Sequence, residues 1–346
     1  MAPIKSSLAK SVGKLLGVFK DTDLSLRGHV QSTRHIVPPF SASGGNLANG
    51  LEPGNGYTYH TFGTNGDFVV SGSAGTVDIL IVAGGGAGGN DRGGGGGAGG
   101  IVHHSQLTLE VGTYPVVVGD GGAQPGTDGS QGADGTDSSF ASSPSPVYLV
   151  AKGGGGGGHN SPTDGGTGGS GGGANFASNP GPSNQAPQNS PFSGATGFNQ
   201  YGNVGGDGSG GPKYNNGGGG GAGGAGGDAT TGSDSNAAGD GGNGQPFPGF
   251  TGPLIGVPAL NPLGGVYGGG GGASCGSENG YNPPIAPAGT GGPGGGGNGG
   301  GAGSGDEGAS GVQYSGGGGG GGHRSPESTK GGGGGDGIVI IRYQPN

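Results

Sequence analysis

Runs of consecutive glycine recur along the chain and restrict its possible folds more than any other feature. The segment at 217–228 reads GGGGGAGGAGGD, and similar runs lie at 84–89, 93–100, 153–158, 268–272, 294–302, 316–322 and 331–335. Glycine makes up 107 of the 346 residues, which leaves little for an apolar core. Because glycine loses more backbone entropy on folding than other residues, these runs are either flexible linkers or a structure held by the backbone itself. Collagen is excluded, since it requires glycine at every third position and these runs do not keep that period.

Segments typical of β-strands precede the longest glycine-rich region. They are short, rich in β-branched and aromatic residues, and lie at 57–62, 67–72, 76–85, 101–111, 113–119 and 147–152. A last such segment, GIVIIRY, follows at 337–343, and its run of four Ile and Val residues can be buried only against the earlier strands. The sequence therefore predicts a mainly β fold, in which a jelly-roll-like β-sandwich of about eight strands is formed by residues 41–152 and closed by strand 337–343.

Residues 153–336 are predicted to be an ordered glycine-rich module rather than a linker. Both of its ends return to one β-region, and loops of mixed composition separate its runs. Helices of the polyglycine II type resemble polyproline II, with three residues per turn and about 3.1 Å rise. Glycine keeps the N–H that proline lacks, so neighbouring helices can hydrogen-bond, each bond contributing about 1 kcal/mol net. We therefore expect a long inserted polyglycine II helix bundle with exposed loops.

Residues 1–40 are predicted to be a separate docking segment. Their apolar residues recur at helical spacing, and the set includes Ile4, Leu8, Val12, Leu15, Leu16 and Phe19. Six Lys or Arg against Asp21 and Asp23 give this segment a net charge of +4, which leaves −13 for the rest of a chain whose total is −9. Because such an amphipathic helix is marginal alone, we expect Ile4, Leu8, Val12, Leu15 and Phe19 to dock onto another protein. Contact with a membrane surface and an unbound terminus are the alternatives.

The composition argues against several functional classes. An acidic, glycine-rich body is a poor binder of nucleic acid, which requires clustered Lys and Arg. The single Cys275 cannot form an internal disulfide framework. No apolar run is long enough for a transmembrane helix, and no secretory signal is evident.

No pattern of catalytic, cofactor-binding or metal-binding residues stands out, so we expect neither an enzyme nor a cofactor or metal site. Windows that match G-x-G-x-x-G arise by chance among so many glycines, and the helix that should follow them is missing. His103 and His104 lie on a predicted strand and would face opposite sides of it. Four carboxylates are spaced too irregularly for a calcium loop, which favours an ordinary polar loop; they are Asp120, Asp128, Asp134 and Asp137.

Aromatic residues outside the predicted strands are candidates for a contact surface, because aromatic anchors dominate recognition. The candidate receptor contacts are Phe176, Phe192, Phe198, Tyr201, Tyr214, Phe250 and Tyr281, and Phe247 and Tyr267 lie in the same loops. The alternative is that these side chains cover the glycine bundle as a small core.

Four strings resemble the glycine-rich domain of virion proteins of marine, cyanophage-like bacteriophages, which are often tail fibre or structural proteins. They are TVDILIVAGGGAGG, GGGGGAGGIVHHSQLTLEVGTYPVVVGDGG, GGGGGGH and GGGGGDGIVIIRY, and the resemblance covers about residues 57–346. The leader SVGKLLGVFKDTDLSLRGHVQSTRHI resembles that of cyanophage fibre-like proteins. In plan the body is similar to phage adhesins with polyglycine II sandwiches, whose tip loops bind the host, and to the glycine-rich domain of certain receptor kinases.

The resemblance implies a bacteriophage fibre or adhesin that is located in the virion. Its expected partners are other virion proteins of the tail, the portal-proximal region or the capsid, and a glycan or protein of the host surface. A purely architectural capsid or tail decoration protein is the alternative within this class. An ice-binding protein is an alternative from another class, although the regular Thr rows that would favour it are missing. Self-association into a homo-oligomer stays open.

Overall fold

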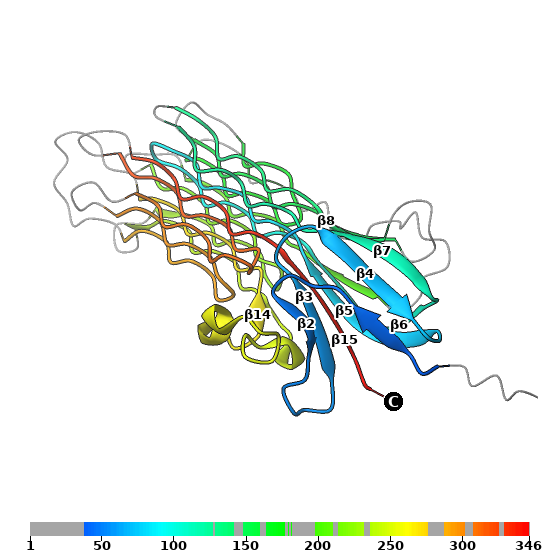
Figure 1. Cartoon of the computed structure of the whole chain (residues 1–346). Helices are drawn as coiled ribbons and strands as arrows, with labels where there is room; N and C mark the ends of the chain where they lie inside the picture. The colour runs from blue at the N-terminus through cyan, green and yellow to red at the C-terminus, as the bar shows by residue number, and fades with distance from the viewer. Residues whose placement is uncertain are drawn as a thin grey trace, which may run out of the picture. The chain divides into compact units, whose positions relative to one another are not determined.

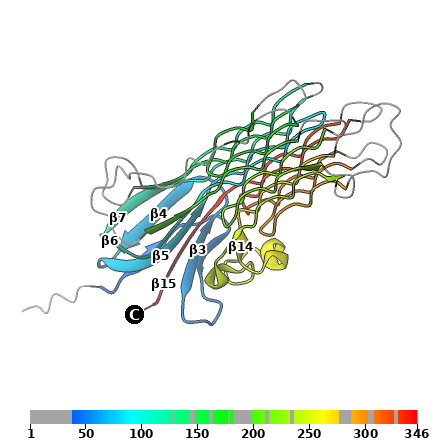
Figure 2. The same ribbon diagram turned by 180° about the vertical axis from the view of Figure 1, so that it is seen from behind.

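Antiparallel β-strands and hydrogen-bonded glycine-rich segments make up most of the described chain. The computed structural model describes residues 38–126, 129–141, 148–159, 164–176, 179, 181, 198–209, 214–231, 236–275, 287–301, 307–324 and 329–345. Phe40–Asn346 form one compact unit, and Met1–Pro39 form a second one, so all five predicted docking residues lie outside the described residues. In the larger unit, the strands lie at one end and glycine-rich segments run side by side away from them (Figures 1 and 2).

Eleven strands in the described residues form two antiparallel sheets. The order in the five-stranded sheet is β1 (Ser41–Ser43), β4 (Gly66–Ser71), β7 (Gly112–Val117), β8 (Ser138–Phe140) and β9 (Leu149–Ala151). The order in the six-stranded sheet is β10 (Phe198–Tyr201), β6 (Ile101–Leu109), β5 (Gly75–Val82), β15 (Ile338–Tyr343), β3 (Thr58–Phe62) and β2 (Ala48–Leu51). The prediction of a mainly β fold is confirmed. The sequence did not predict β1, β2, β8 or β10, which are only three or four residues long and contain no β-branched residue.

Strand β15 is the last strand of the chain, yet it lies inside the six-stranded sheet between β5 and β3. Ile340 pairs with Leu80 on one side and with Thr61 on the other. The prediction that this strand returns to the earlier ones is therefore confirmed. Its continuous apolar run follows from its position, because both faces of the sheet are covered here: Val339 and Ile341 enter one core, and Ile338 and Ile340 enter another.

The first core lies between the two sheets. Alternate residues of facing strands fill it, among them Phe62, Phe68, Ile79, Ile81, Leu109, Phe140 and Leu149. The second core covers the outer face of the six-stranded sheet. It joins Tyr59, Leu80, Ile101 and the β15 side chains to one of the predicted loops, so the alternative of a small core holds for this loop, although the core covers the sheet rather than the glycine bundle.

That covering segment spans 245–267, the yellow part of Figure 1. It contains β13 (Gln245–Pro246), the 3-10 helices η1 (Pro248–Phe250) and η2 (Pro258–Leu263), and β14 (Val266–Tyr267), which pairs with β13. Its buried side chains include Phe247, Phe250, Ile255, Val257, Leu260 and Tyr267. Side chains of β3 hold its backbone, since the hydroxyl of Thr61 donates to the Ile255 carbonyl at 2.8 Å and that of Tyr59 to the Gly249 carbonyl at 2.9 Å.

The glycine-rich segments are hydrogen-bonded to one another, and we call the set the glycine array. It comprises 84–89, 93–100, 119–122, 132–136, 153–158, 170–174, 217–227, 239–244, 268–274, 289–300, 308–312, 316–322 and 331–336. These segments lie on both sides of residue 153, so the array is not confined to 153–336. Another pair of strands, β11 (Thr230–Thr231) and β12 (Asn236–Ala237), forms a separate two-stranded sheet.

Segment 93–100 shows how the array is held together. Along it, successive N–H groups donate in rotation to 316–322, 152–158 and 217–220, at 2.8–3.1 Å. Its carbonyl groups accept in rotation from 271–274, 83–89 and 170–173. Every third residue therefore faces the same neighbour, and six segments surround this one. A flexible linker has no such pattern, so the described runs are ordered elements.

At most glycine positions of the array, the spacing between segments leaves no room for a side chain. A Cβ added at Gly95 would lie 2.0 Å from the Gly271 carbonyl oxygen, and one added at Gly97 would lie 2.2 Å from that of Ser170. Alanine occurs only where its methyl group fits, as at the fully buried Ala87, Ala98 and Ala174. The high glycine content is therefore a packing requirement of the array.

Asp and Asn side chains replace the missing neighbours at the margins of the array. The carboxylate of Asp134 accepts from the Gly156 N–H at 2.7 Å, that of Asp137 from Gly153 at 2.9 Å, and that of Asp336 from Gly121 at 2.9 Å. Elsewhere Asp228 and Asp240 accept from backbone N–H groups in the same way. Some of the acidic residues of the body therefore accept hydrogen bonds from backbone N–H groups at the margins of the array.

Candidate functional site

The segments of the array change composition together at the end away from the sheets. Strand β5 continues into 84–89, and 93–100 continues into β6, so the turn 90–92 between them lies at the far end (Figure 1). Residues 83–89 separate this turn from the last residue of β5. Gly93 and Gly94 contact Ser274, Gly322 and Gly158, which brings the residues that follow these three beside the turn.

We call these residues the end layer. It comprises 90–92, 159, 175–176, 214–216, 274–275 and 323–324. Most of its polar residues are buried, which is uncommon for such side chains unless they are hydrogen-bonded; they are Asn90, Asp91, Arg92, His159, Asn175, Asn215, Asn216, Ser274 and His323.

Amide side chains in the end layer continue the backbone hydrogen bonding of the array. Asn216 accepts from the Phe176 N–H at 3.1 Å and donates to the Ser274 carbonyl at 2.8 Å. Asn90 accepts from the Gly331 N–H at 2.9 Å and donates to the Gly126 carbonyl. These bonds tie neighbouring segments together where the glycine pattern stops, so the end layer is a fixed surface.

Three residues of the end layer have strained backbone conformations. Among the described residues only five non-glycine residues have positive φ, and Asp91 (47°), Arg92 (62°) and Tyr214 (41°) are three of them. Such conformations cost about 1–3 kcal/mol each and concentrate at functional sites. The three are in one cluster, because the Arg92 guanidinium lies 4.9 Å from the centre of the Tyr214 ring, and Phe176 meets that ring edge-on at 4.6 Å.

Positive charge gathers at this end of an otherwise acidic body. Asp91 pairs with Arg324 through Nε at 3.5 Å, and the Arg324 side chain is 46% exposed. Lys330 follows Thr329, whose carbonyl accepts from the Asp91 N–H. Of the other basic residues after residue 40, Lys152 pairs with Asp137, Arg342 lies in the sheets, and Lys213 is outside the described residues. The end layer therefore combines cationic groups with two partly exposed aromatic rings.

The structure separates the predicted contact residues into three groups. Phe176 and Tyr214 lie together in the end layer, whereas Phe192 and Tyr281 lie outside the described residues. The sequence suggested that Phe198 and Tyr201 lie in a loop. They lie instead on β10, where Phe198 packs against the first core and Tyr201 against the second. Phe250 is only 2% exposed, so its ring is not a surface contact, and the same holds for Phe247 and Tyr267.

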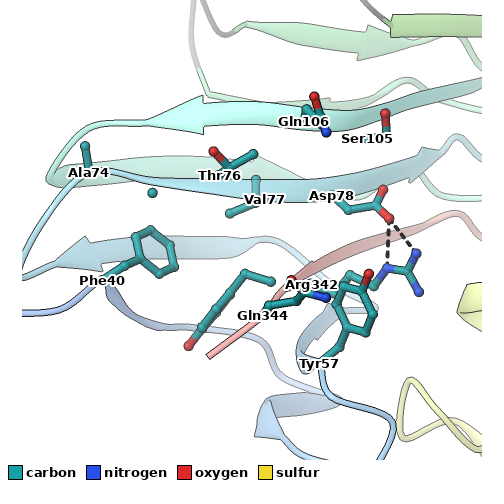
Figure 3. Close-up of a pocket in the computed structure, with 12 residues that line it drawn as sticks. Phe40, Tyr57, Ala74, Thr76, Val77, Asp78, Ser105, Gln106, Arg342 and Gln344 are labelled. Carbon is teal, nitrogen blue, oxygen red and sulfur yellow. Dashed lines mark hydrogen bonds and ion pairs between the residues drawn. The ribbon is translucent and has the colours of Figure 1, made fainter. Parts of the chain in front are cut away.

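A pocket of about 410 Å³ lies at the sheet end and contains a second group of charges (Figure 3). Asp78 Oδ2 contacts Arg342 Nε at 2.8 Å and Nη2 at 2.7 Å. The guanidinium carbon of Arg342 lies 4.4 Å from the ring centres of both Tyr57 and Phe250, and Nη1 donates to the Gly249 carbonyl at 2.9 Å. These charges satisfy each other and hold the 245–267 segment on the sheet, so we do not assign them to a ligand.

The residues considered for metal binding have other partners or positions. Asp134 and Asp137 accept from array N–H groups, and Asp128 is outside the described residues. His103 contacts Asp78 at 2.8 Å, while His104 is buried on the opposite face of β6. In the described ranges no group of three or more His, Cys, Asp or Glu is arranged to hold a metal ion. No helix there has the length and apolar character needed to cross a membrane.

Sequence reasoning missed the end layer as a unit, although a signal for it exists. Each of several glycine runs is bounded at one end by polar or aromatic residues, as in GGGGGGHN, GGGANF, YNNGGGGG and GGGGGGHR. Which ends coincide depends on the direction of each segment, and that direction is fixed by hydrogen bonds between residues far apart in the sequence.

Comparison with known proteins gives one result for the body of the chain. A family model described as glycine-rich domain matches residues 58–344, from β3 to the end of β15. No curated protein matches.

Proposed function

The chain belongs to the glycine-rich domain family, and from this premise we propose that it is a fibre or adhesin of a bacteriophage virion. In this proposal, the array is a rigid support that holds the end layer and its adjoining loops away from the sheets. The mechanism is binding, with the end layer contacting a glycan or protein of the host surface. The observation that carries the proposal is the end layer itself, a hydrogen-bonded layer that presents two partly exposed aromatic rings and holds the strained residues Arg92 and Tyr214 in contact.

We further propose that the array segments are polyglycine II helices. The support is the rotation of hydrogen-bond partners along 93–100, since a threefold helix directs every third N–H to the same side. The proposal also treats the two sheets as a jelly-roll-like sandwich. Both sheets are antiparallel and share the first core, as such a sandwich requires.

The N-terminal segment is proposed to attach the protein to the particle. Its apolar positions and net charge of +4 contrast with the acidic body, and its string resembles the leader of cyanophage fibre-like proteins. The partner would be another virion protein of the tail, the portal-proximal region or the capsid. Nucleic acid is not a proposed partner, because the body has too few basic residues.

Adsorption of particles that carry variants tests this function. Tyr214→Ala removes an aromatic ring of the end layer and should reduce adsorption to host cells several-fold without preventing incorporation of the protein. Tyr314→Ala is the matched control, because Tyr314 also has positive φ (63°) and partial exposure but packs against the second core near the sheets. If both variants adsorbed like the parent, an architectural role would replace the adhesin.

A further inference from the structure

We propose that the end layer binds an acidic polysaccharide, meaning sugar rings that carry carboxylate or sulfate groups. This inference rests on the proposed function and names the class of ligand. It starts from the distribution of charge in the described residues, which differs sharply between the end layer and the rest of the body.

The chain from residue 41 onward is acidic as a whole, whereas three of its six basic residues lie at or beside the end layer. Residues from 41 onward carry a net charge of −13, because the total is −9 and residues 1–40 contribute +4. Against this background, Arg92, Arg324 and Lys330 lie together at one end. The described carboxylate that pairs with Arg324, Asp91, is only 11% exposed, whereas Arg324 is 46% exposed. A ligand that approaches this end therefore meets the cation before the carboxylate.

The aromatic rings supply the second part of the recognition. Tyr214 and Phe176 are partly exposed and fixed at 75° to each other. Aromatic side chains combine a large apolar area with low conformational entropy, which suits them to the C–H face of a sugar ring. Arg92 is held against Tyr214 and adds positive charge beneath this surface. A ring that stacks here would place an acidic substituent within the field of Arg324 and Lys330.

The planar guanidinium of Arg324 suits carboxylate and sulfate groups, because it donates through a fork of N–H groups. Its contact with Asp91 through Nε orients the side chain. Lys330 adds a second positive charge. Neutral polysaccharides would lose these charge contacts and retain only the stacking, so the charged polymer should be clearly preferred.

Binding of the full chain to immobilised polymers tests the inference. The probes are alginate, which carries carboxylates, dextran sulfate, which carries sulfates, and unmodified dextran as the neutral reference. We expect binding to at least one charged polymer, weakening with added salt, and little binding to dextran. The double variant R324Q/K330Q should bind about tenfold more weakly, the loss of roughly one charged contact. Its melting temperature should fall only modestly, because Arg324 is 46% exposed although it pairs with the mostly buried Asp91, and binding is therefore compared at a temperature at which both proteins are folded.

Two control variants separate the end layer from other cations. K152Q removes a partly exposed lysine beside β9 that pairs with Asp137 at 2.8 Å, and it should leave binding unchanged. The variant K5Q/K10Q/K14Q/K20Q removes basic residues of the N-terminal segment and should also leave binding unchanged. Loss of binding in the N-terminal variant, or no loss in R324Q/K330Q, would overturn the inference.

The remaining outcomes distinguish this inference from the proposed function. Equal binding to dextran and the charged polymers, or binding to none, overturns the acidic ligand. If Tyr214→Ala particles still adsorbed poorly in that case, the adhesin would stand with a different ligand class. If alginate or dextran sulfate competed with adsorption of the parent particle, and R324Q/K330Q abolished the competition, both proposals would be supported.

Discussion

His60 shows how one buried residue links the stability of this fold to pH. It lies on β3 and is fully buried, with its ring stacked on Tyr343 and edge-on to Phe68. Its Nδ1 donates to the Gly44 carbonyl at 2.8 Å, which assigns the ring proton to that nitrogen in the neutral form. Burial lowers the pKa of His60 below its usual 6.5, and the hydrogen bond to Gly44 opposes this effect without cancelling it.

The lowered pKa predicts loss of stability in mild acid. Below about pH 6.5 the unfolded chain binds a proton at His60 more readily than the folded chain. The free energy of unfolding therefore decreases as the pH is lowered. We expect the melting temperature to drop between about pH 7.5 and pH 5, and to drop less in His60→Gln, although that variant starts lower because it loses ring contacts. Calorimetry across this range measures both slopes. Equal slopes would show that His60 is not the group responsible.

Residue-level prediction worked for strands and failed for residues placed by distant contacts. Composition marked 101–111 as a strand, and β6 is there. Phe198 and Tyr201 have Gly and Asn neighbours that resemble a loop, yet β10 forms because the long return of the chain brings it beside β6. Nothing local to GFNQYGN predicts that pairing.

At the scale of elements, the array depends on close approach between backbones, and matched glycines test this. A Cβ at Gly221 would lie 2.3 Å from the carbonyl oxygens of Asn243 and Gly242. In the same run, a Cβ at Gly224 would have the Asn243 nitrogen, at 3.6 Å, as its nearest neighbour. Gly221→Ala should therefore destabilise the protein by about 1–3 kcal/mol, and Gly221→Val by more. Gly224→Ala should be neutral or slightly stabilising.

Denaturant unfolding of the two alanine variants measures the difference directly. A lower midpoint with an unchanged slope in Gly221→Ala indicates lost stability of the folded state. If the midpoints of Gly221→Ala, Gly224→Ala and the parent coincided, segment 217–227 would be loosely packed. Close approach of backbones at Gly221 would then be disproved.

The elements also divide into those that the sequence predicts and those that it does not. An ordered glycine-rich region could be inferred, because the apolar strand at 338–343 forces the chain to return. The mutual directions of the segments could not, since poly-glycine carries no side-chain pattern to specify a neighbour. A small core in 245–267 could also be inferred from its apolar side chains, but the surface that it covers could not, since only the outer face of the six-stranded sheet explains the buried Ile255 and Leu260.

At the scale of the whole molecule, the sheets and the array of Phe40–Asn346 depend on each other. Strands β5 and β9 continue directly into array segments, and other segments lead into β6 and β15. The register of a sheet therefore sets the positions of the array donors and acceptors. The glycine segments have no large apolar side chains whose burial could drive their folding before the strands form. Pairing of the strands must therefore align the glycine segments with one another.

This dependence predicts one cooperative unfolding transition, which removal of β15 should abolish. Four Ile and Val side chains of β15 are fully buried, and their burial is worth roughly 6–12 kcal/mol together, comparable with the whole stability of a typical protein, about 5–15 kcal/mol. A chain that ends at Asp336 should lose both the β-sheet circular dichroism and the protease resistance of the glycine segments. The intact chain should lose both signals at one temperature. Two separate transitions in the intact chain, or a truncated chain whose glycine segments stay protected, would show that the array folds independently of the sheets.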